Sequence, residues 1–367
     1  MKYRVMCLTP TLVGDGQKLS PIDYMVWRDH VNVLDQRRIF KLLAKGPRLD
    51  GYLAQLKKAD RLDFASWGGF AQNFAGRRIP FENPGTVPVW ERAHAENLFI
   101  PTFAASLSGP YLPATAVKGA LRTGAVFDRW TEGTLKDLAE RIAGERPPRN
   151  PASKIEDVPR AKRVSMGDSR DAAYSAMKVY LLRVSTLVAR GPAKGGSSDA
   201  KFELGWKSVR GSTDSRRIEE STPLFAEMAT PGTTFEGVWS EKSTQDRTRL
   251  FQSANRYAAG QLARHKHYAE SAGLARVAAL VEALEERLKE IGASQNYCML
   301  SVGWGGGLHS KVACLETEGA AYRSVLKQYS LYDRALQTGL PFPKTRRVIF
   351  ENNQPASLPG WVLLEVA

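Results

Sequence analysis

The segment at residues 303–311 carries the residue types best suited to hold a phosphate chain. Four of the five residues 303–307 are glycine, the exception being Trp304, and Lys311 follows shortly after them. Glycines permit positive φ angles and let a ligand approach the backbone N–H groups closely. The spacing matches neither the GxxxxGK[ST] pattern of a P-loop nor the GxGxxG pattern of a dinucleotide site. We therefore expect an extended phosphate backbone as the ligand, although tight turns use glycines in the same way.

Individual contacts can be predicted within this segment. We expect Gly305, Gly306 and Gly307 to let the phosphate backbone approach, and Lys311 to supply a cation. Trp304 is a candidate for stacking on a base, a contact that contributes about 1–3 kcal/mol per base when the ring is exposed. A buried position in the core is an equally good interpretation of Trp304.

A second basic segment lies at the start of a predicted helix that runs from Pro113 to about Trp130. Thr115 is placed to cap this helix. Lys118 and Arg122 are four residues apart and therefore project from the same helix face. The free N–H groups and the dipole at a helix start also favour anions. The alternative is a solvated basic face on an ordinary helix.

Two further short segments have matching chemistry. Phe342-Pro343 is followed by Lys344, Arg346 and Arg347, three cations just before a predicted strand. Ser169 follows Gly167-Asp168 and offers a hydroxyl that can donate to a phosphate. The alternatives are a solvated charge run before an edge strand, and a plain turn at Ser169.

Several elements are predicted to position these segments. A strand over 3–8, a strand over 31–35 and a helix from Gln36 to Leu43 open the chain, and residues 67–90 are expected to be irregular. A strand is predicted over 177–188, and two helices over 245–291 are expected to be divided by Gly273. A buried strand over 297–302 leads into the glycines, and segments 348–350 and 361–366 are expected to pair as a closing hairpin.

This order of elements predicts an α+β fold of ferredoxin-like or RNA-recognition-motif type, with inserted helical and loop regions. The length of 367 residues allows two or three domains. A breaker at Arg146–Pro151 suggests a ferredoxin-like region over 1–150 and a second α+β region over 151–367, the latter containing the long helices and the glycine-rich loop.

The composition favours a polyanionic partner. The chain has 52 Lys and Arg against 38 Asp and Glu, a formal net charge of +14. Each phosphate neutralised by such a protein releases condensed counterions, which favours nucleic acid as the partner. The three cysteines form no CxxC pair, so a reducing cytoplasm fits, and we expect no signal peptide. No apolar run approaches the roughly 20 residues that span a bilayer.

The sequence contains no recognisable catalytic set. His265 and His267 are two apart in a predicted helix and cannot chelate together, and neither HExxH nor GxSxG occurs. His309 beside the glycines is a weak candidate for a general base. Asp15, Asp35 and Asp168 would bind a metal only if the fold gathered them. We therefore expect no catalytic residues, no cofactor and no metal.

Four segments in this order resemble the RAMP superfamily of CRISPR-Cas proteins, and most of all its group of fifth Csm subunits of type III-A effector complexes. The family pattern PGSSLKGALRT is similar to residues 112–123, although Ala114–Val117 depart from it. Its SDS element resembles 167–169, with Gly167 in the first place, and its FPKTR element is present at 342–346. The N-terminal Thr9-Pro10 and the Ser20–Tyr24 stretch fit the same group.

The resemblance implies an RNA-binding protein. A member of this group caps the effector backbone at the 3′ region of the CRISPR RNA and contacts neighbouring RAMP backbone and small subunits. It aids maturation of that RNA and is not the subunit that cleaves target RNA. Target RNA is a further candidate partner. The residues that would contact RNA are Thr115, Lys118, Arg122, Ser169, Trp304, Gly305, Gly306, Gly307, Lys311, Lys344, Arg346 and Arg347.

Two other functions stay open on the sequence. The first is a RAMP endoribonuclease, acting in CRISPR-RNA processing or in target cleavage, for which His30, Asp35 or His309 would matter. The second is a protein–protein scaffold with a basic surface, for which the glycines would serve only as turns.

Overall fold

A five-stranded antiparallel sheet forms the centre of the protein. The computed structural model describes residues 1–58, 62, 73–131, 133–135, 164–189, 202–208, 214–317, 319–327, 336 and 341–367. The mixed α+β class is confirmed. The sheet has the strand order β13-β16-β1-β12-β7. Its members are β1 (Lys2–Cys7), β7 (Val164–Met166), β12 (Thr234–Glu241), β13 (Tyr297–Ser301) and β16 (Trp361–Val366).

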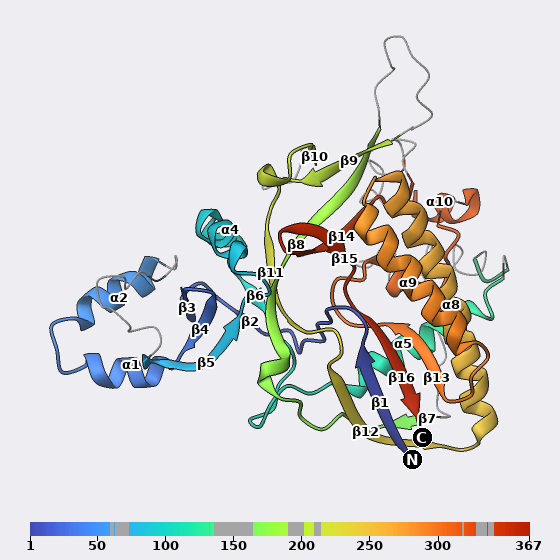
Figure 1. Ribbon diagram of the computed structural model, residues 1–367, viewed down its shortest axis with the longest axis horizontal. Coiled ribbons are helices and arrows are strands. Elements are labelled where there is room, and N and C mark those ends of the chain that lie inside the picture. The colour runs from blue at the N-terminus through green and yellow to red at the C-terminus, as the bar shows by residue number, and fades with distance from the viewer. Residues whose placement is uncertain are drawn as a thin grey trace, which may run out of the picture.

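The first strand, β1, lies in the middle of this sheet, and its side chains alternate between core and solvent. Tyr3 and Val5 are buried, while Lys2 and Arg4 are exposed. Val5 lies opposite Phe235 of β12 on one side and opposite Leu364 of β16 on the other. The N- and C-terminal strands are therefore neighbours, as Figure 1 shows.

Three long helices pack beside the sheets. They are α5 (Ala114–Phe127), α8 (Thr244–Ser271) and α9 (Ala275–Ile291). Helix α5 comes so close to α8 that a Cβ on Gly124 would lie 2.8 Å from the Cα of Ala254. Gly273 has φ of +68° between α8 and α9, which confirms the predicted division. The two helices lie side by side in Figure 1.

A second sheet is built around the long strand β8 (Met177–Ala189), which was predicted from the sequence. Strand β8 pairs with β9 (Phe202–Lys207) on one edge at its C-terminal half and with β11 (Leu224–Ala229) at its N-terminal half. Its other edge pairs with β14 (Thr345–Glu351). The sheet is completed by β10 (Asp214–Ser215) and β15 (Gln354–Ser357).

The predicted hairpin between 348–350 and 361–366 is wrong. Strand β14 turns back into β15, and β16 pairs instead with β1 and β13. The reason is the tight turn at Asn352 and Asn353, which have φ of +51° and +60°. Asparagine adopts the left-handed conformation more readily than most residues, and paired positive φ angles suit a short hairpin loop.

A small unit extends from the main body at the left of Figure 1. Its core joins Met25, Leu34, Ile39 and Tyr52. The predicted helix over 36–43 is confirmed. The elements of the unit are β3 (Tyr24–Trp27), β4 (His30–Leu34), β5 (Ala75–Pro80), α1 (Gln36–Leu43) and α2 (Leu49–Lys58).

The expectation of irregular structure over 67–90 is wrong where the chain is described. Strand β5 pairs with β4 despite its glycine and terminal proline, because proline is tolerated at strand ends. Helix α4 (Val87–Arg92) follows, with Pro88 in its first turn. The remaining elements are β2 (Lys18–Leu19), β6 (Ile100–Pro101), α10 (Ala320–Leu326) and short 3₁₀ turns.

Residues from both sides of position 150 share the central sheet and its core, where Val5 and Leu121 pack with Phe235 and Leu364. The predicted boundary between 150 and 151 lies outside the described residues, and the division into two regions stays a prediction.

Candidate nucleic-acid interface

The glycine-rich segment forms a loop clamped on the turn after β1. Gly303, Gly305 and Gly307 have φ of +76°, +103° and +73°, in the region that favours glycine. The backbone N–H of Trp304 donates to the carbonyl of Leu12 at 2.8 Å. A Cβ on Gly303 would collide with that carbonyl oxygen and would lie 2.9 Å from Val13 Cγ2. The first glycine is therefore required by packing within the protein.

The later glycines face different surroundings. A Cβ on Gly305 would lie 2.6 Å from Pro359 Cγ, and one on Gly306 would lie 2.6 Å from Ser310 Oγ. A Cβ on Gly307 would have no heavy atom within 4 Å. Of the three glycines predicted to admit a phosphate backbone, only Gly307 would therefore accept a Cβ without contact.

A cleft of about 330 Å³ separates this loop from α5. We call it the α5 cleft. It brings together residues that lie almost two hundred positions apart in the sequence. Its polar and glycine lining consists of Thr115, Gly119, Arg122, Thr123, Ser301, Gly303, Ser310 and Lys311.

The α5 cleft is positively charged. None of the described residues that line it is acidic, while Arg122 and Lys311 lie on opposite walls. Lys118 is exposed on α5, one turn before Arg122. All three cations were predicted from the sequence; Arg122 and Lys311 line the cleft, and Lys118 lies outside its lining. Ser310, which no sequence pattern singled out, adds a hydroxyl to the wall that holds Lys311.

The start of α5 is capped by a residue from another part of the chain. The N–H of Ala114 donates to Asp168 Oδ1 at 2.8 Å. Thr115 is exposed on the first turn, and the prediction that it caps the helix is wrong. A carboxylate 54 positions away serves this role, and local sequence gives no sign of such a contact.

Ser169 supports the same helix start from within the protein. Its buried hydroxyl accepts the N–H of Leu112 at 2.8 Å and donates to the carbonyl of Arg170 at 2.8 Å. Because this hydroxyl is already used, the structure gives Ser169 a positioning role and lends no support to a phosphate contact.

Removing the cap should destabilise the protein without unfolding it. We expect Asp168→Ala to lower the free energy of unfolding by about 1 kcal/mol, the usual cost of losing a helix cap. Urea denaturation measures this change. Glu236→Ala is the matched control, because Glu236 is a neighbouring exposed acid. Equal effects of the two substitutions would show that the Asp168 contact contributes nothing.

A second hollow lies on the other side of the loop, against β14. It is lined by the three later glycines together with Thr345, Arg347 and Pro359. Burial lowers the pKa of the Arg347 guanidinium. No carboxylate among the described residues forms an ion pair with Arg347, and its Nε has no hydrogen-bond partner there. A cation held in this way beside the loop is suited to an anionic ligand.

The position of Arg347 bears on whether Trp304 stacks on a base or packs in the core. Its guanidinium carbon lies over the Trp304 ring, 4.8 Å from the ring centroid. The indole is half-buried and packs against the main core. The interpretation of Trp304 as a packing residue therefore fits the structure better than stacking of a base on the ring.

Arg346 lines the same hollow but is largely buried. It is 8% exposed, its Nε donates to His265 Nδ1 at 3.1 Å, and it lies over the Tyr268 ring. Arg347 is half-buried in that hollow. The RNA contact predicted for Arg346 stays a prediction. Lys344, just before β14, is half-buried.

The residues considered for catalysis are not brought together. His30 Nδ1 lies 2.7 Å from Asp29 Oδ1 in the small unit. Asp35 caps α1 by accepting the N–H of Arg38. His309 is buried in the main body, and its burial and nearby cations hold its pKa well below the ordinary value. Among the described residues, no group of three or more His, Cys, Asp or Glu side chains could hold a metal ion.

None of the described helices combines the length and the apolar character that a membrane-spanning segment needs.

Comparison with known proteins identifies the fold. No protein-family model matches the chain, and no curated protein matches it either. A solved structure, the crystal structure of T. onnurineus Csm5, matches with a TM-score of 0.58 and 14% identity, over 98% of this chain and 99% of that one. This chain has a Csm5-like fold. The predicted resemblance is confirmed at the level of the fold, over the full length.

A second match comes from a complex. One chain in a cryo-EM structure of a Csm–crRNA–target RNA ternary complex of a type III-A CRISPR-Cas system has a TM-score of 0.63 and 17% identity. The match covers 100% of both chains. At these identities the likeness concerns the fold, and the residues of the α5 cleft must carry any argument about function.

Proposed function

We propose that this chain is a non-catalytic subunit of a type III-A CRISPR effector complex that binds the 3′ region of the CRISPR RNA. The α5 cleft is the observation that carries this proposal. Its walls hold Arg122 and Lys311 with no acidic lining among the described residues. The Csm5-like fold supports the same proposal, because a matching chain belongs to a Csm complex with guide and target RNA.

The cleft would bind the RNA backbone without base-specific contacts. Lys118, Arg122 and Lys311 supply the charges that neutralise phosphates, and contacts of this kind position a nucleic acid without reading its sequence. Gly119 in the cleft has no heavy atom within 4 Å of a Cβ position, and neither has Gly307 in the hollow on the other side of the loop, so that a strand can come close to both. Arg347 on the far side of the loop extends the basic path.

The wider role follows from the complex in which the matching chain is found. We propose that the protein caps the backbone of the effector in the cytoplasm, next to a RAMP backbone subunit and the small subunits, and aids maturation of the guide. Target RNA is a further proposed partner. Purification of the complex with an affinity tag on this chain should recover RNA of discrete length. Recovery of the other subunits without RNA would favour the scaffold function instead.

A glycine-to-alanine pair separates folding from RNA contact. Gly119 and Gly51 both lie within helices, and a Cβ at either meets nothing within 4 Å. Alanine at each should raise the free energy of unfolding by about 0.5–1 kcal/mol. Only Gly119→Ala places a methyl group in the α5 cleft.

We therefore expect Gly119→Ala to bind single-stranded RNA more weakly, by about tenfold if the clash costs about 1.4 kcal/mol, although the folded protein is more stable. Gly51→Ala should bind as the wild type does. Fluorescence anisotropy with labelled RNA measures both. If Gly119→Ala bound RNA with wild-type affinity, the RNA backbone would not approach α5 closely at Gly119.

The nuclease alternative has a direct test. His30 and Asp35 belong to the small unit and His309 to the main body. We expect the purified chain to leave repeat-containing RNA intact, with and without divalent cations. Cleavage that disappears in His309→Gln or Asp35→Asn would contradict the non-catalytic proposal.

A further inference from the structure

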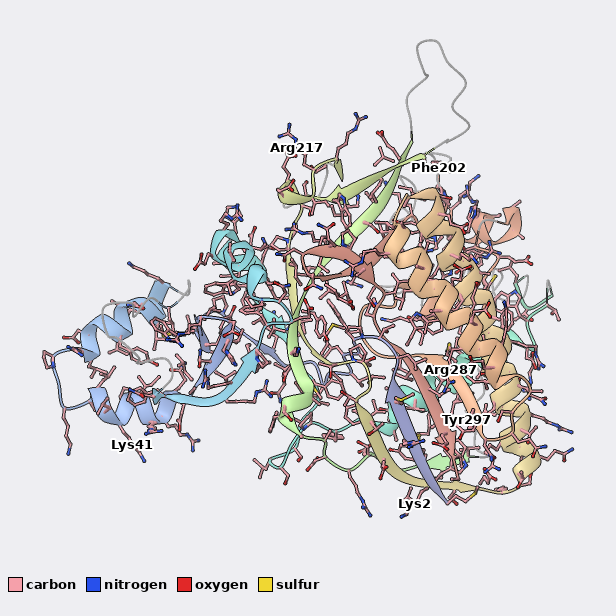
Figure 2. All side chains as sticks on the ribbon, viewed as in Figure 1. Lys2, Lys41, Phe202, Arg217, Arg287 and Tyr297 are labelled. Atoms are coloured by element: carbon pink, nitrogen blue, oxygen red, sulfur yellow. The ribbon has the colours of Figure 1, made fainter. Side chains whose placement is uncertain are left out.

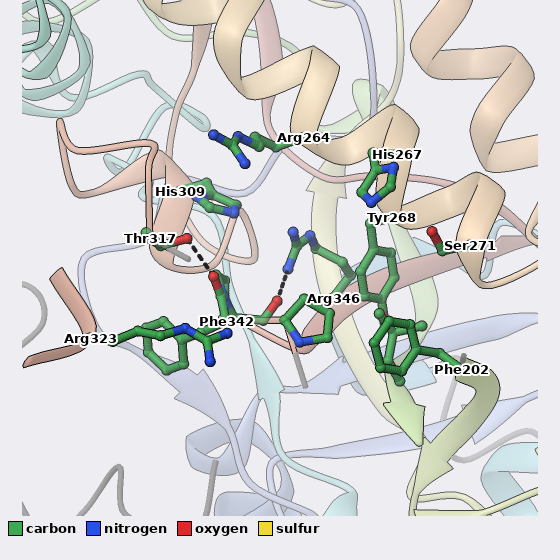
Figure 3. A pocket seen from close by; sticks show the side chains of 13 residues that line it. Phe202, Arg264, His267, Tyr268, Ser271, His309, Thr317, Arg323, Phe342 and Arg346 are labelled. Atoms are coloured by element: carbon green, nitrogen blue, oxygen red, sulfur yellow. Dashed lines mark hydrogen bonds between the residues drawn. The ribbon is translucent and has the colours of Figure 1, made fainter. Parts of the chain in front are cut away.

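A small pocket behind β14 is not used by the function proposed above. It has a volume of about 120 Å³ and lies between the C-terminal half of α8, α10 and the segment 341–346. We call it the α8 pocket. Figure 3 shows side chains entering it from different elements, Arg264 from α8, Arg323 from α10 and Arg346 from β14. No sequence pattern links these arginines, because they are isolated in three segments.

The lining is rich in cations and contains no carboxylate. Arg264, Arg323 and Arg346 line the pocket with His267 and His309, and none of the described lining residues is acidic. Arg264 is half-buried and forms no ion pair with any described residue. Arg264 therefore gives this partly desolvated space a positive charge that attracts an anion.

The His309 ring offers a polar atom to the same space. Its Nδ1 is buried and has no hydrogen-bond partner among the described residues, and the residue is 3% exposed. The backbone at His309 is held in place, because the His309 carbonyl accepts the Gln261 side-chain amide at 2.6 Å and the Tyr257 hydroxyl. A neutral imidazole can carry its proton on Nδ1 and donate it to an anion.

Arg346 is also set in a fixed orientation. Its Nη1 donates to the carbonyls of Pro343 and Thr345, both at 2.9 Å, and its Nε donates to His265. These bonds occupy its Nε and Nη1 donors, so Arg346 contributes a fixed positive charge to the pocket and not a paired hydrogen bond.

The size of the pocket limits the ligand. Its volume is only about 120 Å³. A phosphate group fits such a space, whereas several stacked nucleotides do not. A phosphate within an RNA chain would need room for the chain to enter and to leave.

We propose that the α8 pocket binds one terminal phosphate monoester of an RNA strand. The proposal rests on the RNA-binding function proposed above, and it adds an end-specific site to the path along the glycine loop. Arg346 borders both this pocket and the hollow beside the loop, so a strand leaving the loop has a short way to the pocket. A monoester carries more negative charge than a diester, which suits the excess of cations.

The test compares one RNA sequence with four kinds of end. Short single-stranded RNAs with a 5′-phosphate, a 3′-phosphate, both or neither are titrated against the full chain at fixed salt. We expect one of the phosphorylated ends to bind about tenfold more tightly than the hydroxyl form, because charge-assisted hydrogen bonds are among the strong ones. Arg264→Gln should abolish that preference, while Arg249→Gln, an exposed arginine on the same helix, should retain it.

A second measurement covers the free anion. Inorganic phosphate should raise the Tm of the wild type above that in chloride of equal ionic strength, and should not do so in Arg264→Gln. Equal affinity for all four ends, with salt-sensitive RNA binding retained, would overturn the terminal-phosphate site and leave the proposed function standing. A Tm shift without an end preference would also overturn it, in favour of a free-anion site. If the wild-type protein bound none of the four RNAs, the proposed function itself would be contradicted.

Discussion

Replacing Lys118 and Arg122 together by glutamine should lower the affinity for single-stranded RNA about 10- to 100-fold, since two lost contacts at about 0.7–1.4 kcal/mol each cost about 1.4–2.7 kcal/mol. Glutamine keeps the helix propensity of α5, so the fold should persist. The dependence of log affinity on log salt should also become shallower by about 1.4, because each phosphate contact on a single strand contributes about 0.7.

The matched control is another basic pair with the same spacing. Arg37 and Lys41 are exposed and four residues apart on α1. Figure 2 places Lys41 on the outer side of the small unit, away from the α5 cleft. The Arg37→Gln/Lys41→Gln variant removes the same net charge and should change the salt dependence little. An equal loss in both variants would indicate that RNA responds only to net charge, and that α5 has no special part in binding.

Substituting Gly303 by alanine should give the largest loss of stability in the loop. The residue has φ of +76°, and its Cβ would meet both the carbonyl of Leu12 and the Val13 side chain. We expect a loss of about 2–5 kcal/mol in the free energy of unfolding, the sum of about 1–2 kcal/mol for the left-handed backbone and about 1–3 kcal/mol for overpacking.

Gly16→Ala separates the two contributions. Gly16 has φ of +96° and has nothing within 4 Å of a Cβ position, so its substitution should cost only the backbone part, about 1–2 kcal/mol. Urea denaturation of both variants gives the difference. If Gly303→Ala were no worse than Gly16→Ala, the close contact between the loop and Leu12 would not exist in solution.

The periodic elements could be predicted because their evidence is local. The helix over 36–43 and the division at Gly273 follow from apolar spacing and from one glycine. The pairing of β16 with β1 could not be predicted in the same way, since it joins the two ends of the chain. The adjacent asparagines at 352 and 353 are a usable local signal for the β14–β15 hairpin, because this residue type tolerates positive φ angles.

The candidate site shows the same contrast. The sequence predicted phosphate contacts for Lys118, Arg122 and Lys311, and the fold places Arg122 and Lys311 on opposite walls of one cleft. No local pattern indicated that Asp168 would cap α5 or that the first glycine would contact Leu12. The burial of Arg346 could have been foreseen, because alternate residues of a strand face opposite sides. No sequence pattern indicated the α8 pocket, because its arginines are single residues on three separate elements.

Photocrosslinking can show whether RNA lies between α5 and the glycine loop. Bound single-stranded RNA is crosslinked to the wild-type chain, and the attached peptides are identified by mass spectrometry. We expect crosslinks within residues 111–123 and 302–311, and we expect them to be lost when Lys118 and Arg122 are replaced by glutamine. Crosslinks confined to the small unit or to the outer faces of α8 and α9 would contradict RNA binding between α5 and the glycine loop.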